Sequence, residues 1–390
     1  MTALYSTQGG ADHPAPSGKE ERSVPDVLIF ADTVRSPELR HEVPLAAPDP
    51  MIYMERNGTS RVYAASLEVP RLEEIGGFEV VPDEVLGFDD LIAEGYGFHE
   101  VNRELVLRAC QHAGTESVVV PRSFPLDAAD HLRAKGIDVR ADGEVFDRRR
   151  RQKTEVELEG IRHALRASER AYNRAREVLR DDRGVSSEGL RTEISRTLTD
   201  AGMRTPDIVI VSHGKQTAVG HAPGHGRIER GEPIIIDLAP QHPDSGCYSD
   251  MTRTLCVGEP PTQLVEYHRL CVEVLERVRP AIRPGVTGVE LFGLACDVFE
   301  REGFPTQRTK EPGEVLDEGF YHSLGHGVGL EVHELPLLGR TGQKLVAGDV
   351  VAVEPGLYAK DFGGCRLEDL MLVTEDGCEV LTDYPYDLEP

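Results

Sequence analysis

Three histidines fall within one short segment, YHSLGHGVGLEVHE, which covers residues 321–334 and contains His322, His326 and His333. Imidazole side chains bind divalent metal ions and carry protons near neutral pH. If the segment is an extended strand, His322 and His326 project to the same side of it, and the interspersed glycines allow backbone or substrate to approach closely. For any one of these histidines a polar sheet edge is the simpler interpretation, so other ligand-type residues have to decide.

Four acidic residues stand in or beside apolar runs elsewhere in the chain. Asp237 ends the run EPIIID, and Asp250 lies on the return strand YSDMTRT of the same predicted hairpin. Glu354 ends the run VVAVE before a Pro-Gly break, and Glu368 follows Arg366 by two residues in CRLEDLMLV, so that both would share one strand face. Carboxylates buried close together raise one another's pKa. Taken singly, each acid could be a turn residue or the partner of an arginine such as Arg366.

A metal centre would account for all of these residues at once. The candidate ligands are Asp237, Asp250, His326, Glu354 and Glu368. An oxygen-rich set with one imidazole suits two hard or borderline divalent ions better than one structural zinc. Two dications would cancel the charge of the four carboxylates, which explains how so many acids could share an interior.

The elements that must position these residues lie in the C-terminal part of the chain. Thr154 and Glu157, in capping-box spacing, begin a long amphipathic helix, and a second helix starts near Ser187. Strands are then predicted at 207–211, at 232–237 and in YSDMTRTLCVG. Two further helices at 262–279 and 287–302 precede strands at 321–334, 350–354 and 366–374. Two helices followed by strands, twice over, predict a duplicated α+β arrangement with the site between the halves.

A separate and smaller α/β domain is predicted for residues 26–147. Short β-rich runs alternate there with helical ones, and Asn57-Gly58 between two apolar runs predicts a tight hairpin turn. The basic run RRRRQK at 148–153 is interpreted as a solvated linker in preference to an anion site. A flexible polar tail at 1–25 and a catalytic domain at 154–390 complete the predicted organisation.

Composition restricts the partners. A formal net charge of −25 argues against nucleic acid and anionic membranes, because phosphate groups repel such a surface. Peptides or other small molecules are the expected substrates. Seven scattered cysteines without a CxxC pair indicate reduced thiols in a cytoplasmic protein. No apolar run approaches the ~18 residues that cross a bilayer, and no apolar leader segment is present, so no membrane partner is expected.

The stretches IIIDLAPQHPDSGCYSDMTRT, HSLGHGVGLEVHELP, VAVEPGLY and CRLEDLMLV together resemble the signature segments of the pita-bread metallopeptidases. The resemblance is greatest to the Xaa-Pro branch, which contains prolidase and aminopeptidase P. It implies a pita-bread catalytic domain behind a creatinase-like N-terminal domain, and a homodimer. The implied activity is hydrolysis of Xaa-Pro bonds in dipeptides or at the N-terminus of short peptides, by a hydroxide that bridges two metal ions. Manganese is the expected metal, with cobalt, zinc or iron as alternatives.

The resemblance also implies a role for each ligand. Asp237 would chelate the first metal ion, while Asp250 and Glu368 would bridge both. His326 and Glu354 would complete the second, and Glu354 would also carry a proton to the leaving amine.

Four further residues have implied roles near the substrate. His221 and His333 would hydrogen-bond the substrate carbonyl and the developing oxyanion. His322 would contact substrate, and Arg366 would contact substrate or orient Glu368. His221 could instead be a loop residue displaced by His225, and His322 could fill a core position.

Two departures from the family pattern affect these expectations. The twelve residues between Asp237 and Asp250 exceed the number in the prolidase pattern, so the hairpin tip is longer here. Gly220 precedes His221 where the family usually has a Pro-His pair, which puts proline specificity in question. Two alternatives therefore stay open: the same metal site acting on another small amide or an osmolyte, and a non-catalytic binding protein.

Overall fold

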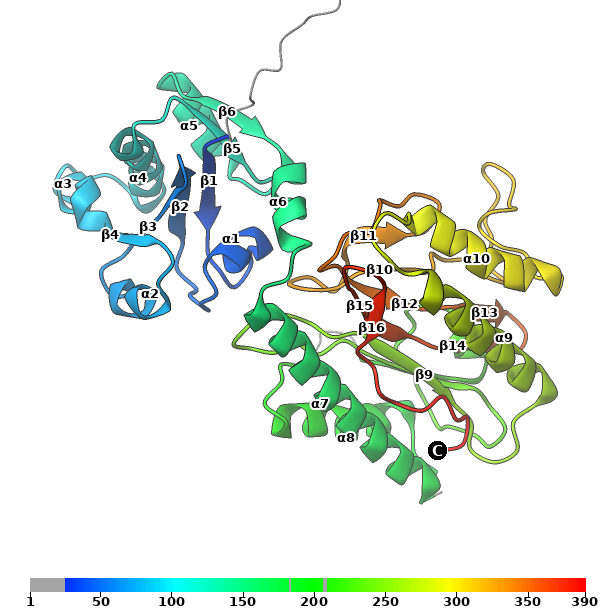
Figure 1. The fold of residues 1–390 in the computed structure, drawn as a ribbon. Coiled ribbons are helices and arrows are strands. Elements are labelled where there is room, and N and C mark those ends of the chain that lie inside the picture. The colour runs from blue at the N-terminus through cyan, green and yellow to red at the C-terminus, as the bar shows by residue number, and fades with distance from the viewer. Residues whose placement is uncertain (1–24, 182–183, 206–208) are drawn as a thin grey trace, which may run out of the picture.

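The computed structural model describes residues 25–181, 184–205 and 209–390 of the chain. Two α/β lobes follow one another along the sequence, joined through helix α6 (Gly143–Arg150), as Figure 1 shows. The predicted tail lies outside the described residues except for its last position. Within the described ranges, no helix combines the length and apolar character that crossing a membrane requires.

The N-terminal lobe is built on a six-stranded sheet in the order β4-β3-β2-β1-β5-β6. Its strands are β1 (Val27–Ala31), β2 (Met51–Arg56), β3 (Thr59–Ala64), β4 (Glu79–Pro82), β5 (Ser117–Val120) and β6 (Asp138–Ala141). The hairpin predicted at Asn57-Gly58 joins β2 to β3, and both residues have the positive φ that such a turn requires.

Helices cover both faces of this sheet, because successive side chains of a strand point to opposite faces. Leu28 packs in one hydrophobic core, whereas Val27 and Ile29 pack in the other. The first core includes residues of α3 (Phe88–Ala93), α4 (Phe98–Ala113) and α5 (Leu126–Ala134), and of the 3-10 helix η1 (Asp83–Leu86). The second includes residues of α1 (Pro37–Glu42), α2 (Val69–Ile75) and α6.

The C-terminal lobe contains two similar halves, as predicted. The first half packs α7 (Glu155–Arg180) and α8 (Ser187–Asp200) on a three-stranded sheet of β7 (Ile210–His213), β8 (Ile234–Leu238) and β9 (Met251–Leu255). The second half packs α9 (Thr262–Val278) and α10 (Gly288–Arg301) on a five-stranded sheet. The capping box predicted at the start of α7 is confirmed, and α10 begins with a capping box as well.

The five-stranded sheet has the order β11-β10-β12-β15-β16. Its strands are β10 (Gly325–Gly327), β11 (Glu334–Leu338), β12 (Val350–Val353), β15 (Asp369–Val373) and β16 (Cys378–Val380). A separate hairpin, β13 (Gly356–Ala359) with β14 (Gly363–Arg366), and the 3-10 helices η2 (Gly214–Ala218) and η3 (Arg279–Ala281) complete the lobe. In Figure 1 the helix pairs lie on the outside and the strands between them.

Two predicted strands are wrong in extent. Residues 321–334 do not form one strand, because only Gly325–Gly327 pair with neighbours before the chain bends and resumes at Glu334. Residues 366–374 likewise divide between β14 and β15, with Leu367 and Glu368 between them. The glycine-rich sequence of the first segment permits bends that a period-two pattern does not reveal.

The interpretation of the basic run 148–153 as a solvated linker is also wrong. The limits of the two domains stay a prediction. Arg150 ends α6 and donates to Glu334 at 2.6 Å, and the Lys153 ammonium contacts the same carboxylate. Arg151 pairs with Asp349 at 2.7 Å. Because the side chains of Lys153 and Glu334 are only 2% and 6% exposed, the run anchors the interlobe helix to the C-terminal lobe.

This anchor makes a testable contribution to stability. Removing one partner of a buried ion pair leaves the other charge poorly compensated. Lys153→Met should therefore lower the free energy of unfolding by about 3 kcal/mol, measured by urea denaturation. Lys215→Met is the matched control, because Lys215 is 70% exposed and pairs with Asp361 only at 3.9 Å. Equal stability of the two variants would show that the pair is not an anchor.

Candidate metal centre

Strand register places the two aspartates on one face of the first half. In the β8–β9 ladder Asp237 lies directly opposite Thr252, so their side chains point the same way. Asp250 precedes Thr252 by two residues and shares that face. Bridges beyond the ladder continue the hairpin to Gln241 and Tyr248, which keeps Asp250 in an extended, buried position.

The second half aligns its ligand candidates by the same rule. His326 pairs with Ala352 across β10 and β12, and Glu354 follows Ala352 by two residues, so all three side chains share a face. Continuing the β12–β15 ladder by one residue beyond its last pair, Val353 with Asp369, sets Glu368 opposite Glu354. The backbone N–H of Glu368 donates to Thr252 O at 3.0 Å, which brings the two halves together.

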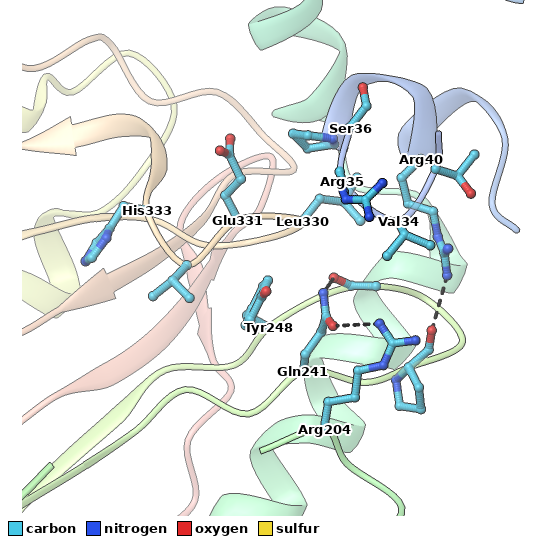
Figure 2. A pocket seen from close by; sticks show the side chains of 15 residues that line it. Val34, Arg35, Ser36, Arg40, Arg204, Gln241, Tyr248, Leu330, Glu331 and His333 are labelled. Carbon is cyan, nitrogen blue, oxygen red and sulfur yellow. Dashed lines mark hydrogen bonds between the residues drawn. The ribbon is translucent and has the colours of Figure 1, made fainter. Parts of the chain in front are cut away.

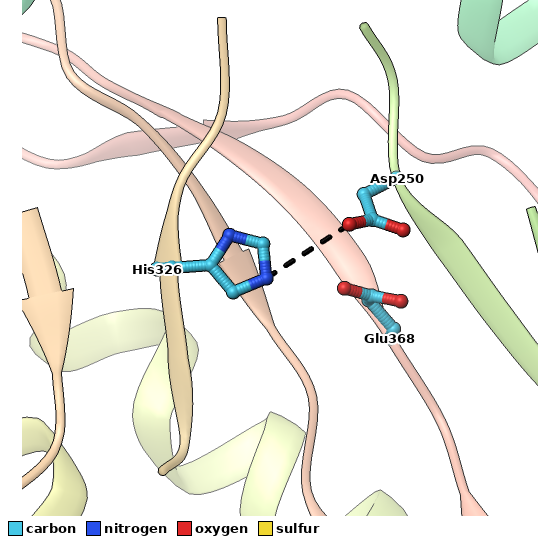
Figure 3. Close-up of side chains that lie close together, drawn as sticks. All are labelled: Asp250, His326 and Glu368. Carbon is cyan, nitrogen blue, oxygen red and sulfur yellow. Dashed lines mark ion pairs between the residues drawn. The ribbon is translucent and has the colours of Figure 1, made fainter. Parts of the chain in front are cut away.

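These residues meet at one buried point, shown in Figure 3. Asp250, His326 and Glu368 each offer a ligand atom, and the three atoms lie within 4.8 Å of one another. His326 Nε2 is 3.8 Å from Asp250 Oδ2 and 3.6 Å from Glu354 Oε1. The three residues are 2–6% exposed. Four of the five predicted ligands are therefore adjacent.

The fifth, Asp237, is engaged by an arginine. Arg366 Nη2 donates to Asp237 Oδ2 at 2.6 Å, and the same guanidinium reaches Tyr358 Oη at 3.3 Å and Thr252 Oγ1 at 3.3 Å. Among the described residues Arg366 forms no ion pair with Glu368, so the expectation that it orients Glu368 stays a prediction. β14 ends at Arg366, and the chain turns before Glu368.

The electrostatics of the centre call for positive charge. Burial, followed by repulsion from neighbouring carboxylates, raises the pKa of Asp250 and of Glu368 well above the usual range. Burial also lowers the pKa of His326, which keeps its imidazole neutral and able to bind a metal ion. Arg366 compensates one of the four carboxylates, so three negative charges would remain if all were ionised. The donor set therefore fits divalent cations, which favour carboxylate oxygen and neutral imidazole.

The three other candidate histidines, His221, His322 and His333, lie in two different surroundings. His333 stacks edge-on against His326 with ring centroids 4.2 Å apart, and both His333 and His221 line a cavity of about 540 Å³ together with Asp237 and Asp250. We call this the metal-side cavity. His322, in contrast, uses both ring nitrogens, Nδ1 toward Ser323 O at 2.7 Å and Nε2 toward Tyr358 Oη at 3.0 Å.

Sequence reasoning missed some of the residues that hold this arrangement. One of them is Thr252, whose hydroxyl donates to Glu368 Oε2 at 2.7 Å. Tyr358, which links His322 to Arg366, was not noted at all. Its position four residues after Glu354, in a run already suspected of chemistry, is the signal that could have identified it.

The Thr252 hydroxyl provides a direct test of the centre. Thr252→Val keeps the shape of the side chain but removes the hydrogen bond that orients Glu368. Loss of such a partner typically weakens metal binding by about 10- to 100-fold, to be measured by calorimetric titration with Mn²⁺. Thr192→Val on the exposed face of α8 removes a comparable hydroxyl away from the centre and should leave affinity unchanged. Unaltered affinity in Thr252→Val would place the metal elsewhere.

Comparison with known proteins agrees with this geometry. A profile of metallopeptidase family M24 matches residues 159–375. Xaa-Pro dipeptidase of Pyrococcus furiosus is 32% identical over 232 residues, which are 59% of this chain and 62% of that protein. Xaa-Pro dipeptidase of Pyrococcus horikoshii is 30% identical over 275 residues, which are 69% of this chain and 74% of that protein. The chain thus spans less than two thirds of the first relative and about three quarters of the second.

Solved structures share both lobes of the fold. X-Pro aminopeptidase from Thermotoga maritima has a TM-score of 0.76 at 23% identity, covering 93% of this chain and 96% of that one. Prolidase from Pyrococcus furiosus has a TM-score of 0.72 at 24% identity, covering 94% and 98%. The two-domain α+β pita-bread fold predicted from the sequence is confirmed.

Proposed function

Because the chain belongs to metallopeptidase family M24, we propose that it hydrolyses Xaa-Pro bonds in dipeptides or at the N-terminus of short peptides. The observation that carries the proposal is the buried convergence of Asp250, His326 and Glu368, with Glu354 beside them. The names of the Pyrococcus relatives support the choice of substrate.

Two divalent ions, manganese in the first instance, are proposed as the cofactors. Asp237, Asp250, His326, Glu354 and Glu368 would hold them. Bound ions supply Lewis-acid activation of the attacking water and of the scissile carbonyl. With four carboxylates and Arg366 in the centre, one dication would leave a negative charge and two would leave a single positive charge. The net positive charge with two ions favours the binding of an electron-rich substrate oxygen.

The protein's own groups perform the remaining steps. Glu354 is half-buried beside His326 and is proposed to take a proton from water and pass it to the leaving proline nitrogen. His221 and His333 line the metal-side cavity and would donate hydrogen bonds to the substrate carbonyl as negative charge develops on it. Arg366 is proposed to fix Asp237, and His322 to fix Tyr358.

A substrate panel tests the activity. The protein, incubated with Mn²⁺, Co²⁺, Zn²⁺ or Fe²⁺, should release the first amino acid from Xaa-Pro dipeptides and Xaa-Pro-Yaa tripeptides. The released amino acid is measured by detection of its free amine. Peptides with alanine in place of proline should react more slowly. Failure to cleave any of the proline peptides under all four metals would refute the proposal and leave the other amide substrates or a binding role.

Asp250→Asn tests the metal centre through two opposite effects. Removal of one buried carboxylate should lower metal content and turnover by orders of magnitude. It should also leave the metal-free protein as stable as the wild type, or more so, because repulsion with Glu368 is relieved. Thermal unfolding without Mn²⁺ measures the stability of the metal-free protein. Its shift on addition of Mn²⁺ reports metal binding, since a ligand that binds only the folded state raises its stability. Turnover is measured with the substrate panel. Full metal content and activity in the variant would contradict the assignment.

The proposed organisation also includes domains at 26–147 and 154–390, a homodimer and a cytoplasmic location. Dimerisation rests on the likeness of the N-terminal lobe to that of the creatinase-like proteins. Light scattering at several protein concentrations would measure the mass in solution, and a monomer throughout would exclude the dimer.

A further inference from the structure

A second cavity adjoins the metal-side cavity and has the opposite electrostatic character. It encloses about 380 Å³ between the loop that leads into α1, the tip of the β8–β9 hairpin and the bend before His333. Three of its lining residues are Arg35, Arg40 and Arg204. We call it the arginine cavity. Figure 2 shows it with His333 at one end and Arg40 at the other.

The two cavities lie against one another. Arg204, Gln241, Tyr248, Val332 and His333 line both. A peptide that is held at the metal centre and extends past His333 would therefore reach the arginine cavity. Each cavity alone falls in the range of ~300–1,000 Å³ that is usual for small-molecule sites.

Arg204 lies at the junction of the two cavities, and no carboxylate of the described residues pairs with it. Two backbone hydrogen bonds, of 2.9 and 3.1 Å, tie Arg204 to Gln241 at the base of the hairpin tip. Its guanidinium donates to the Gln241 side chain at 3.3 Å, and Gln241 is itself oriented by a 2.8 Å bond to Gly246 O. The backbone is thus fixed while the guanidinium keeps free donors.

Arg40 forms the far wall of the cavity and is equally without a described carboxylate partner. It is buried and donates to the backbone carbonyls of Ser245, Pro243 and Asp244 at 3.3, 3.3 and 2.6 Å. Burial lowers the pKa of the Arg40 guanidinium, and the like charge of Arg204 lowers it further. Arg35, by contrast, pairs with Asp32, and Glu331 in the cavity wall pairs with Arg150.

The hairpin tip is shaped around Arg40. Gly246 has a φ of 79°, and a Cβ there would lie 3.3 Å from Arg40 Nε and from Leu330 Cδ2. The tip belongs to the stretch that is longer here than in the prolidase pattern. The wall of the arginine cavity is therefore a property of this chain's own hairpin.

We propose that the arginine cavity binds the C-terminal carboxylate of a short peptide, with Arg204 as its principal contact, so that tripeptides of the form Xaa-Pro-Yaa are preferred substrates. The inference rests on the proposed function. A short peptide carries a positive amine at one end and a carboxylate at the other. The metal centre must meet the scissile carbonyl next to the amine end, and the arginine cavity suits the carboxylate end, with which a guanidinium can form charge-assisted hydrogen bonds.

A cycle of two enzymes and two substrates tests the proposal. The wild type and Arg204→Gln are each assayed with Ala-Pro-Ala and with its C-terminal amide, Ala-Pro-Ala-NH₂, in the presence of Mn²⁺. Hydrogen bonds to charged groups contribute enough that the wild type should prefer the free acid by about 10- to 100-fold in kcat/KM. In Arg204→Gln this preference should fall to about twofold or less, in keeping with the loss of the charged partner.

Controls separate the possible failures. Arg196→Gln removes a charge from the exposed face of α8, where Arg196 pairs with Glu193, and should keep the wild-type preference. Equal rates for acid and amide in the wild type, or an unchanged preference in Arg204→Gln, would overturn the inference while leaving peptidase activity intact. Absence of hydrolysis of every proline peptide would instead refute the proposed function. If Arg204→Gln does not fold, Arg204→Lys, with its single ammonium, should show an intermediate preference, and wild-type behaviour in it would overturn the inference.

Discussion

The structure depends on keeping like charges close together in a dry interior. Asp250 and Glu368 are almost fully buried, and each raises the energy of the other when ionised. Such a pair stays ionised in a folded chain only when the surrounding residues fix the side chains and a cation offsets the repulsion. The duplicated fold meets the first requirement, because each half contributes its acids from strand positions that cannot shift by one residue without reversing face.

A buried arginine joins the two halves directly behind the acids. Arg253, on β9, is 1% exposed and pairs with Asp369 of β15 at 2.9 Å. The same guanidinium donates to Glu368 O at 2.6 Å and to Thr252 O at 2.9 Å. It therefore connects the strand that follows Asp250 with the turn that presents Glu368. Carbonyls of Pro385 and Tyr384 complete its hydrogen bonds, which makes the C-terminal segment part of this support.

The sequence was most informative where one residue type had a single physical explanation. A carboxylate at the end of an apolar strand is costly, so Asp237 and Glu354 could be identified without any structure. Helix starts were equally clear, because the Thr154–Glu157 spacing satisfies defined backbone donors. The resemblance to a known family then supplied the roles that spacing alone leaves open.

The sequence could not predict ion-pair partners that bends in the chain bring together. Arg366 was assigned to Glu368 because residues two apart on a strand point to the same face. However, the strand ends at Arg366, and the guanidinium of Arg366 pairs with Asp237. The basic run before α7 was assigned to solvent by composition, whereas Glu334 and Asp349, nearly two hundred residues away, bury its charges. No local pattern encodes such distant carboxylates.

Charge is distributed within the binding region in a way that the net charge of −25 conceals. Acids converge at the metal centre, whereas Arg40 and Arg204 gather beyond His333, where the N-terminal lobe meets the hairpin tip. Salt screens exposed charges more effectively than buried ones, so the buried Arg40 would retain its influence on an anion bound in the arginine cavity. The core of the N-terminal lobe contains no part of the metal centre. In the proposed function this lobe would nevertheless contribute to substrate binding, because it supplies a wall that makes one end of the binding region positive.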